Sequence, residues 1–340
     1  MKSEMTKNNN RNSGLDYLKA VAAILVVLGH AVTYYESSIG GMGGFWKILN
    51  CIIYAIHVPL FFAAAGYLCH RQPVGEFYKK KLVRILIPFI TFTVLKLIYS
   101  VVIAHEALNA GLLKDAFLYG SFYWFCYAIL LVYLIAPLMW KKEGQGVTPV
   151  SVAILIACIV LQVVFTVKGP AGYGPFQVVQ IVYCYPFFFA GYFVKQYEER
   201  VKSFTSKAAV KAAAIVLGAA LITVYVYIDM KGMEERLFYF PSRLGASLAL
   251  IAFAAGITTL IKGNIRSLSY LGKISLQIML FDSIYKLILF KIVMKLGIMN
   301  PVVCIPVTII DIALTAATCI IIRRIPYLRA LFGVSSMINL

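Results

Sequence analysis

Three residues that could do chemistry lie within one long apolar stretch near the start of the chain. Residues 15–35 read LDYLKAVAAILVVLGHAVTYY and carry Asp16, Lys19 and His30 among apolar side chains. In a helix, Lys19 and His30 fall within about 20° of each other and about 16 Å apart along the axis. A neutral imidazole is poised near physiological pH to take a proton from a hydroxyl, so this face predicts general-base chemistry at His30.

The apolar stretch must hold these groups inside a membrane. A hydrocarbon core about 30 Å thick is crossed by roughly 20 apolar residues in helical form. Ionisable side chains at that depth usually face a bundle interior or an aqueous cavity. We therefore expect Lys19 and His30 to face one enclosed chamber, with Asp16 either pairing with Lys19 or acting directly. The alternative for His30 is a hydrogen bond to a neighbouring backbone carbonyl.

The composition assigns the whole chain to the membrane. Of its 340 residues, 61% are hydrophobic and 14% are charged, and the mean hydropathy is +0.84. These values are typical of an integral membrane protein. The net charge of +18 would suggest nucleic-acid binding in a soluble protein, but here Lys and Arg lie in short connections between apolar stretches. No nucleic-acid partner is expected.

The recurring apolar stretches predict an all-α, polytopic membrane helix bundle with about ten transmembrane helices. The expected spans are residues 15–35, 45–69, 82–104, 116–140, 149–168, 175–195, 208–228, 243–261, 268–295 and 301–322. Assigning alternate loops to opposite sides puts 21 Lys and Arg on the side of the amino terminus and about eight on the other. Because basic loops stay in the cytoplasm, both termini are predicted to be cytoplasmic.

A single membrane domain is expected to span residues 1–340, with residues 1–12 as a polar cytoplasmic tail and no soluble domain. The loops between spans are too short to form one. The seven cysteines lie within or at the ends of apolar stretches without CxxC spacing. We therefore expect neither a disulfide framework nor a metal site. Nothing in the sequence indicates an oligomeric state.

The second span combines a histidine with a helix-breaking residue. His57 lies about midway along it and two residues before Pro59. Proline frees the carbonyl four residues earlier, that of Ala55. His57 is therefore a candidate either for substrate contact or for capping the freed carbonyl. Residues 63–66 (AAAG) offer a smooth surface for close contact with another helix.

A basic cluster precedes the third span. Lys81 and Arg84 are three residues apart, and Pro88 lies four beyond Arg84, which predicts a loosened backbone beside the cations. Ammonium and guanidinium groups here could hold the phosphates of an anionic donor, and Arg84 lies deeper than Lys79 and Lys80. Lys79 and Lys80 fit ordinary topology signals and contacts with lipid headgroups.

Later spans carry further candidates. Tyr123 and Trp124 could stack on a substrate, although an interfacial aromatic belt explains them equally well, and Arg243 could either contact a substrate or snorkel to the interface. Asp282 and Lys286 are spaced i, i+4 and predict a buried ion pair, with Asp311 as a candidate third member. We favour an ion network that fixes helix packing over proton relay or substrate contact.

The order and spacing of these motifs resemble those of the acyltransferase family 3 membrane proteins. The matching segments are Asp16 and Lys19 ahead of His30, His57 with PLFFAAAGYL, Lys81-Leu-Val-Arg84 ahead of Pro88, Tyr123-Trp124-Phe125, and Pro-Ser-Arg243-Leu. Lysine stands at 19 and 81 where that family more often has arginine, which alone makes a planar two-pronged contact. The first span is also similar to the membrane module of vancomycin-resistance-type serine racemases, whose racemase domain is not expected here.

The resemblance implies a membrane O-acyltransferase that moves an acetyl or other short acyl group from cytoplasmic acyl-CoA to a hydroxyl of a cell-surface glycan or a peptidoglycan-type acceptor. The resemblance, together with the residue chemistry, predicts His30, Lys19 and Asp16 as catalytic, Lys81 and Arg84 as acyl-CoA-binding, and His57, Tyr123, Trp124 and Arg243 as substrate-binding. No metal cofactor is expected. The protein is expected to be a multi-pass protein of a bacterial-type plasma membrane. The alternative is a transporter or exporter of a small polar solute or glycan precursor, because mid-membrane charges and helix-breaking prolines serve transport pathways too.

Overall fold

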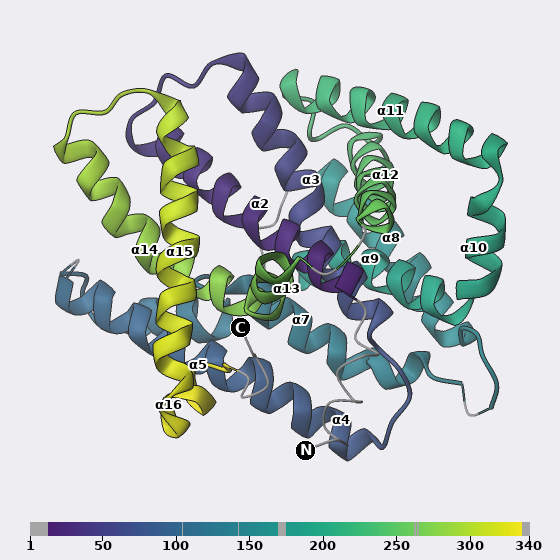
Figure 1. Ribbon diagram of the computed structural model, residues 1–340, viewed down its shortest axis with the longest axis horizontal. Helices are drawn as coiled ribbons and strands as arrows, with labels where there is room; N and C mark the ends of the chain where they lie inside the picture. Colours follow the sequence, from purple (N-terminus) through teal and green to yellow (C-terminus); the bar gives the residue numbers. More distant parts are fainter. Residues whose placement is uncertain are drawn as a thin grey trace.

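The computed structural model describes residues 13–334 apart from 104, 142, 169–174, 262 and 264. These residues form helices and no strand, which confirms the predicted all-α fold (Figure 1). The predicted tail at residues 1–12 lies outside the described residues. The helices are α2 (Ser13–Ser38), α3 (Gly44–Tyr67), α4 (Val74–Lys81), α5 (Ile87–Ile98), α6 (Ala110–Leu113), α7 (Trp124–Ile135), α8 (Pro149–Lys168), α9 (Val178–Gln196), α10 (Glu198–Ser206), α11 (Ala208–Met230), α12 (Tyr239–Leu260), α13 (Arg266–Lys273), α14 (Ser275–Lys295), α15 (Cys304–Arg323) and α16 (Pro326–Leu331).

Eight helical segments among the described residues are long and apolar enough to cross a membrane. They correspond to eight of the ten expected spans, and the chain is a multi-pass membrane protein. The span expected at 116–140 contains only a shorter apolar helical segment, Trp124–Met139. Helix α14 has 21 residues but carries Asp282 and three lysines. The count of ten and the cytoplasmic termini stay predictions.

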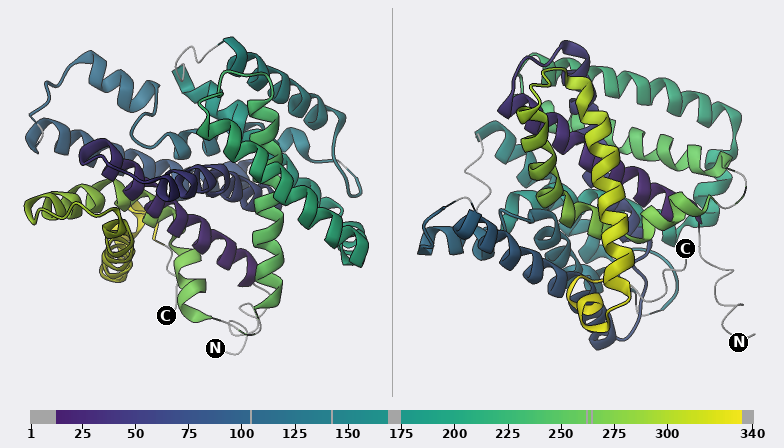
Figure 2. Two further views of the ribbon diagram at one scale, coloured as in Figure 1. Left: turned by 90° about the horizontal axis from the view of Figure 1, so that it is seen from above. Right: turned by 60° about the vertical axis from the view of Figure 1, so that its left-hand side comes forward.

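Helix α2 lies at the centre of the fold. It packs against α3, α13, α14 and α15, and Figures 1 and 2 show these helices around it. The most apolar part of α2 is 61% buried and that of α3 is 67% buried, whereas the corresponding parts of α8, α11 and α12 are each 11% buried. The peripheral helices therefore present apolar surface to lipid, and Asp16 and Lys19 of α2 lie where protein largely covers them.

Two glycines bring α3 and α9 into backbone contact. A Cβ atom at Gly66 would clash with the carbonyl of Phe188, and one at Gly191 would clash with the backbone of Ala63. Small residues allow helices in membranes to approach this closely. The structure confirms the close contact that the AAAG segment at 63–66 predicted.

The backbone between α4 and α5 widens beside Pro88. Residues 82–86 form a π-helical turn, and the amide of Ile87 donates to the carbonyl of Leu82 five residues earlier. Proline has no N–H, so Pro88 cannot donate the ordinary helical hydrogen bond to the carbonyl of Arg84. The expected loosening of the backbone next to Arg84 is therefore present as a wide turn inside one long segment, Val74–Ile103.

Candidate functional site

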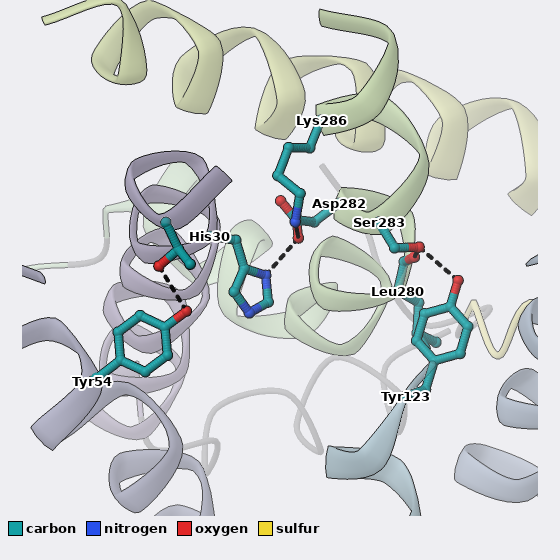
Figure 3. Close-up of polar contacts among 8 residues, drawn as sticks. His30, Tyr54, Tyr123, Leu280, Asp282, Ser283 and Lys286 are labelled. Carbon is teal, nitrogen blue, oxygen red and sulfur yellow. Dashed lines mark hydrogen bonds and ion pairs between the residues drawn. The ribbon is translucent and has the colours of Figure 1, made fainter. Parts of the chain in front are cut away.

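A histidine, a carboxylate and an ammonium group meet at the contact between α2 and α14 (Figure 3). His30 Nδ1 lies 2.6 Å from Oδ2 of Asp282, and Lys286 Nζ donates to the same oxygen at 3.3 Å. The Asp282 side chain is 1% exposed, whereas that of His30 is 35% exposed. The pair of Asp282 and Lys286 was predicted, but its partner His30 was not. His30 Nδ1 thus bonds to a side chain and not to a neighbouring backbone carbonyl, which was the alternative.

The hydrogen-bond network assigns the proton of the imidazole. Because the Asp282 carboxylate accepts a bond from Lys286, it acts as the acceptor for His30 as well, and Nδ1 carries the hydrogen. Nε2 then has a free lone pair. His30 lines a cavity of about 150 Å³ together with Thr33, Tyr34, Ser37, Tyr54 and Lys286. This arrangement, a buried carboxylate behind an accessible imidazole, is suited to accepting a proton from a bound hydroxyl.

His57 lies beside His30 but is held by its own helix. Their ring centroids are 6.5 Å apart, and His57 is 4% exposed. Its Nδ1 donates to the carbonyl of Ile53 at 2.6 Å. The bond thus caps a carbonyl, as one alternative expected, but that of Ile53 and not that of Ala55. The buried ring of His57 meets the ring of Tyr54 edge to face, with the two ring centroids 4.9 Å apart.

Asp16 and Lys19 pair with each other near the start of α2. Lys19 Nζ lies 2.8 Å from Asp16 Oδ1, and Asp16 is 3% exposed. The local ion pair is therefore present. Lys19 lines neither the cavity of His30 nor the cavity of Arg243, so these two cavities do not join Lys19 to His30, and a chamber shared by both stays a prediction. The eleven residues between them place the two groups at different depths of the same helix.

The two basic candidates before α5, Lys81 and Arg84, differ in how far the protein covers them. Lys81 is half-buried, with Nζ 3.8 Å from the ring centroid of Tyr133 and 5.3 Å from that of Phe77. Arg84 is exposed. The aromatic rings therefore cover Lys81, whereas Arg84, in the wide turn at 82–86, is left uncovered. That Arg84 binds the donor stays a prediction.

The two aromatic candidates point into the protein. Tyr123 is 7% exposed and its hydroxyl lies 2.6 Å from Oγ of Ser283, the neighbour of Asp282 (Figure 3). Trp124 is half-buried against the core around α3, α7 and α9. Tyr123 therefore positions the segment of α14 that carries Asp282, and neither side chain lines the two main cavities.

Arg243 lies on a second and larger cavity. Its Nη2 donates to the backbone carbonyl of Tyr54 at 3.3 Å, and its guanidinium stacks over Tyr183 at 4.6 Å from the ring centroid. The residue lines a cavity of about 550 Å³. The alternative of snorkelling does not describe it, because the ring of Tyr183 and the carbonyl of Tyr54 hold the guanidinium inside the protein.

Asp311 is the buried acid that the network leaves aside. It is fully buried on α15, and neither of its carboxylate oxygens has a hydrogen-bond partner among the described residues. Asp311 was a candidate third member of the Asp282–Lys286 pair. It lies close enough to feel the charges of both residues, but among the described residues no hydrogen bond joins it to either. Within the same part of the chain, no three His, Cys, Asp or Glu side chains are grouped to hold a metal ion.

The sequence is matched by a family model described as an acyltransferase domain, that of acyltransferase family 3, over residues 12–324. The chain belongs to acyltransferase family 3. The match includes all of α2, α14 and α15, so the cluster around His30 lies in the domain that defines the family.

Three curated relatives align with parts of this chain. A nodulation protein, NolL, from Sinorhizobium fredii is 31% identical over 141 residues, 38% of this chain and 37% of the relative. NolL from Mesorhizobium japonicum is 25% identical over 202 residues, 55% and 49% of the two chains, and an amino-acid racemase from Enterococcus faecalis is 28% identical over 146 residues, 41% and 20%. The aligned regions thus span less than half of each relative's length. No solved structure gives a significant match.

Proposed function

We propose that this protein is a membrane O-acyltransferase that moves a short acyl group, such as acetyl, from cytoplasmic acyl-CoA to a hydroxyl of a cell-surface glycan or envelope precursor. The family membership supports acyl transfer. The observation that carries the proposal is the 2.6 Å contact between Nδ1 of the accessible His30 and the buried carboxylate of Asp282. The relatives come from bacteria, which supports a bacterial plasma membrane.

The proposed reaction uses Nε2 of His30 for two proton transfers in turn. The acceptor hydroxyl gives its proton to His30 Nε2 while its oxygen forms a bond to the thioester carbonyl carbon. The carbon–sulfur bond breaks, the coenzyme leaves as a thiolate, and the imidazolium returns the proton to that sulfur. Asp282 stabilises the positive imidazolium and keeps Nδ1 protonated throughout, which is the role of the buried acid in a Ser-His-Asp triad.

The basic cluster before α5 supports a donor that enters from the cytoplasm. Lys79, Lys80 and Arg84 are exposed and Lys81 is half-buried, so four cations lie on one turn and a half of helix. Phosphate groups are bound by such clusters through charge-assisted hydrogen bonds. With the predicted topology, this cluster faces the cytoplasm, whereas His30 lies towards the other end of α2. The acyl arm of the donor must therefore extend into the bundle to meet the imidazole.

Thioester consumption tests the proposal against transport. Purified protein in lipid vesicles should release coenzyme A from acetyl-CoA, and His30→Ala should lower this rate by roughly a hundredfold or more, because a general base contributes about 10² to 10⁴ in rate. His30→Gln keeps a polar side chain and should be equally impaired. Uptake of a polar solute into the vesicles without any thioester consumption would contradict the proposal and favour a transporter.

A further inference from the structure

The larger cavity is a second site that opens beside the His30 cavity. It has a volume of about 550 Å³ and lies where α2 and α11 end and α3 and α12 begin. Its functional side chains are Asn50, Tyr54, Tyr225, Asp229, Tyr239 and Arg243. A volume in this range is typical of pockets for small molecules. The smaller cavity of about 150 Å³ holds only a few waters or one small group, since a water takes about 30 Å³ in the liquid.

The chemistry of the lining favours a ring that carries hydroxyls. Oδ1 of Asp229 accepts a bond from the hydroxyl of Tyr239 at 3.0 Å, and the hydroxyl of Tyr225 lies at 3.5 Å. A carboxylate, an amide and phenol hydroxyls together offer both acceptors and donors, which a hydroxyl group matches because it can do both. Tyrosine faces supply the apolar area against which the C–H face of a sugar ring packs.

The charges of the lining favour an uncharged ligand. Two carboxylates, Glu36 and Asp229, face two cations, Lys47 and Arg243. Glu36 and Lys47 form an ion pair at 3.8 Å at the rim, and the guanidinium of Arg243 already stacks on Tyr183 and bonds to the Tyr54 carbonyl. Asp229 lies on the same cavity as Arg243 and opposes its charge, so a ligand that brought a further negative charge would lose hydration without meeting a net positive lining. The formal charges of the cavity sum to zero.

One side chain separates the two cavities. Tyr54 lines both, and its hydroxyl lies 3.1 Å from Oγ1 of Thr33, which lines the smaller one. Asn50, on the larger cavity, donates to the same Thr33 oxygen at 3.3 Å. A ligand seated in the larger cavity is therefore one tyrosine away from the cavity that His30 lines.

We infer that the cavity between α3, α11 and α12 binds the acceptor as an uncharged pyranoside ring, and that Tyr54 guides one ring hydroxyl towards His30. The inference rests on the proposed acyl transfer for the role of the ring, but binding itself does not. The cavity opens at the α2–α3 and α11–α12 loops, which the basic-loop pattern predicts to lie outside the cell. The pyranoside can belong to a soluble glycan or to a lipid-linked precursor, because both present the same ring.

Protection of an introduced thiol tests binding without any turnover. The native Cys51 lines the same cavity although it is buried, so it is first replaced by alanine; the other six native cysteines are also buried. Met230 lines the cavity with 42% of its surface exposed, so Met230→Cys in the Cys51→Ala background supplies the reactive thiol there. The protein is purified in lauryldimethylamine oxide, which has no sugar headgroup, and is labelled with a charged methanethiosulfonate. Saturating methyl glycosides of glucose, galactose and N-acetylglucosamine are added in turn, and each is compared with its dodecyl counterpart as the lipid-linked form.

At least one uncharged glycoside should slow labelling of Met230→Cys at least fivefold, while the glucuronide of methanol should slow it less than twofold. Tyr227→Cys, exposed on the same helix but not on the cavity, should be labelled at the same rate with or without glycoside. Adding Asp229→Asn to Met230→Cys should remove the protection. If no uncharged glycoside protects in either methyl or dodecyl form, or if the glucuronide protects equally well, the inference is overturned.

Kinetics separate this inference from the proposed function. With the protecting glycoside as acceptor, Asp229→Asn should raise its KM at least tenfold and change kcat much less, as expected of a binding contact. Tyr239→Phe, which removes one hydrogen bond to Asp229, should raise KM less. Protection without acyl transfer by the unaltered protein would overturn the acyltransferase proposal and leave the cavity as a sugar site. Acyl transfer with an unchanged KM in Asp229→Asn would overturn the cavity and leave the function.

Discussion

At the scale of single residues, one buried carboxylate determines what His30 can do. Oδ2 of Asp282 contacts both His30 and Lys286, and its Oδ1 is buried without a hydrogen-bond partner among the described residues. A buried carboxylate needs such cationic or donating neighbours to offset its lost hydration. The same contacts hold the imidazole in the tautomer that leaves Nε2 free. Asp282 is therefore a positioning residue for His30.

Asp282→Asn should separate the charge of this residue from its shape. The amide keeps the size of the side chain but removes the charge and can stabilise the wrong imidazole tautomer, so we expect kcat to fall by about 10² to 10⁴. Asp282→Glu should recover part of the loss. The matched control is Tyr285→Phe on the same helix, which removes a 2.6 Å bond to Thr318 and should lower stability by about 1 kcal/mol while kcat stays within threefold. Equal kcat in the asparagine variant and the unaltered protein would contradict this role.

At the scale of helices, close backbone contact between α3 and α9 fixes the position of the wall that bears His57 and Tyr54. Helix α3 continues through Pro59 and carries these residues on the side of α2 and α12. On its other side, Gly66 allows the carbonyl of Phe188 to approach. The position of Tyr54 and His57 therefore depends on the contact between α3 and α9, which involves none of the polar side chains of the site.

Gly66→Ala should destabilise the protein although alanine favours helices. The added methyl group clashes with the backbone of α9, which cannot move as a side chain end can, so we expect a loss of about 1 to 3 kcal/mol. Gly256→Ala on α12 is the matched control, because nothing lies within 4 Å of the added Cβ. It should be neutral or more stable by up to about 1 kcal/mol. Thermal unfolding in one detergent compares the two, and equal melting temperatures would contradict the contact.

The sequence was informative where one helix supplies all the information. The apolar stretches predicted the helical class, the spacing of Asp282 and Lys286 predicted their ion pair, and the AAAG segment predicted a close contact. Partners between helices were not predictable, because periodicity along α2 says which side of the helix His30 occupies but not which helix faces it. The only hint of a partner for His30 was the presence of Asp282 and Lys286, spaced i, i+4, within an expected membrane span. The cover of Lys81 by Tyr133 was not predictable either, because Tyr133 lies on another helix.

At the scale of the molecule, the uneven distribution of Lys and Arg predicts the orientation in the membrane. Helices that alternate in direction place the α11–α12 loop and the loop before α4 on opposite sides. Basic loops remain cytoplasmic, so the loop before α4, with Arg71, should face inward.

Thiol labelling in intact cells should establish this orientation. Met233→Cys in the α11–α12 loop should react with a membrane-impermeant maleimide, whereas Gln72→Cys before α4 should react only after the cells are opened. The buried native cysteines give little background. The reverse pattern would place the basic cluster outside the cell and remove the route for cytoplasmic acyl-CoA.

The fate of an isotopically labelled acyl group tests the central claim most directly. The purified protein is incubated with acetyl-CoA labelled in the acetyl group and with a panel of glycoside acceptors, and the products are identified by mass spectrometry. We predict a labelled O-acetyl ester on one acceptor, formed by the unaltered protein and reduced by about a hundredfold or more in His30→Gln. A labelled ester formed equally well by His30→Gln would contradict the assignment of His30 as the base.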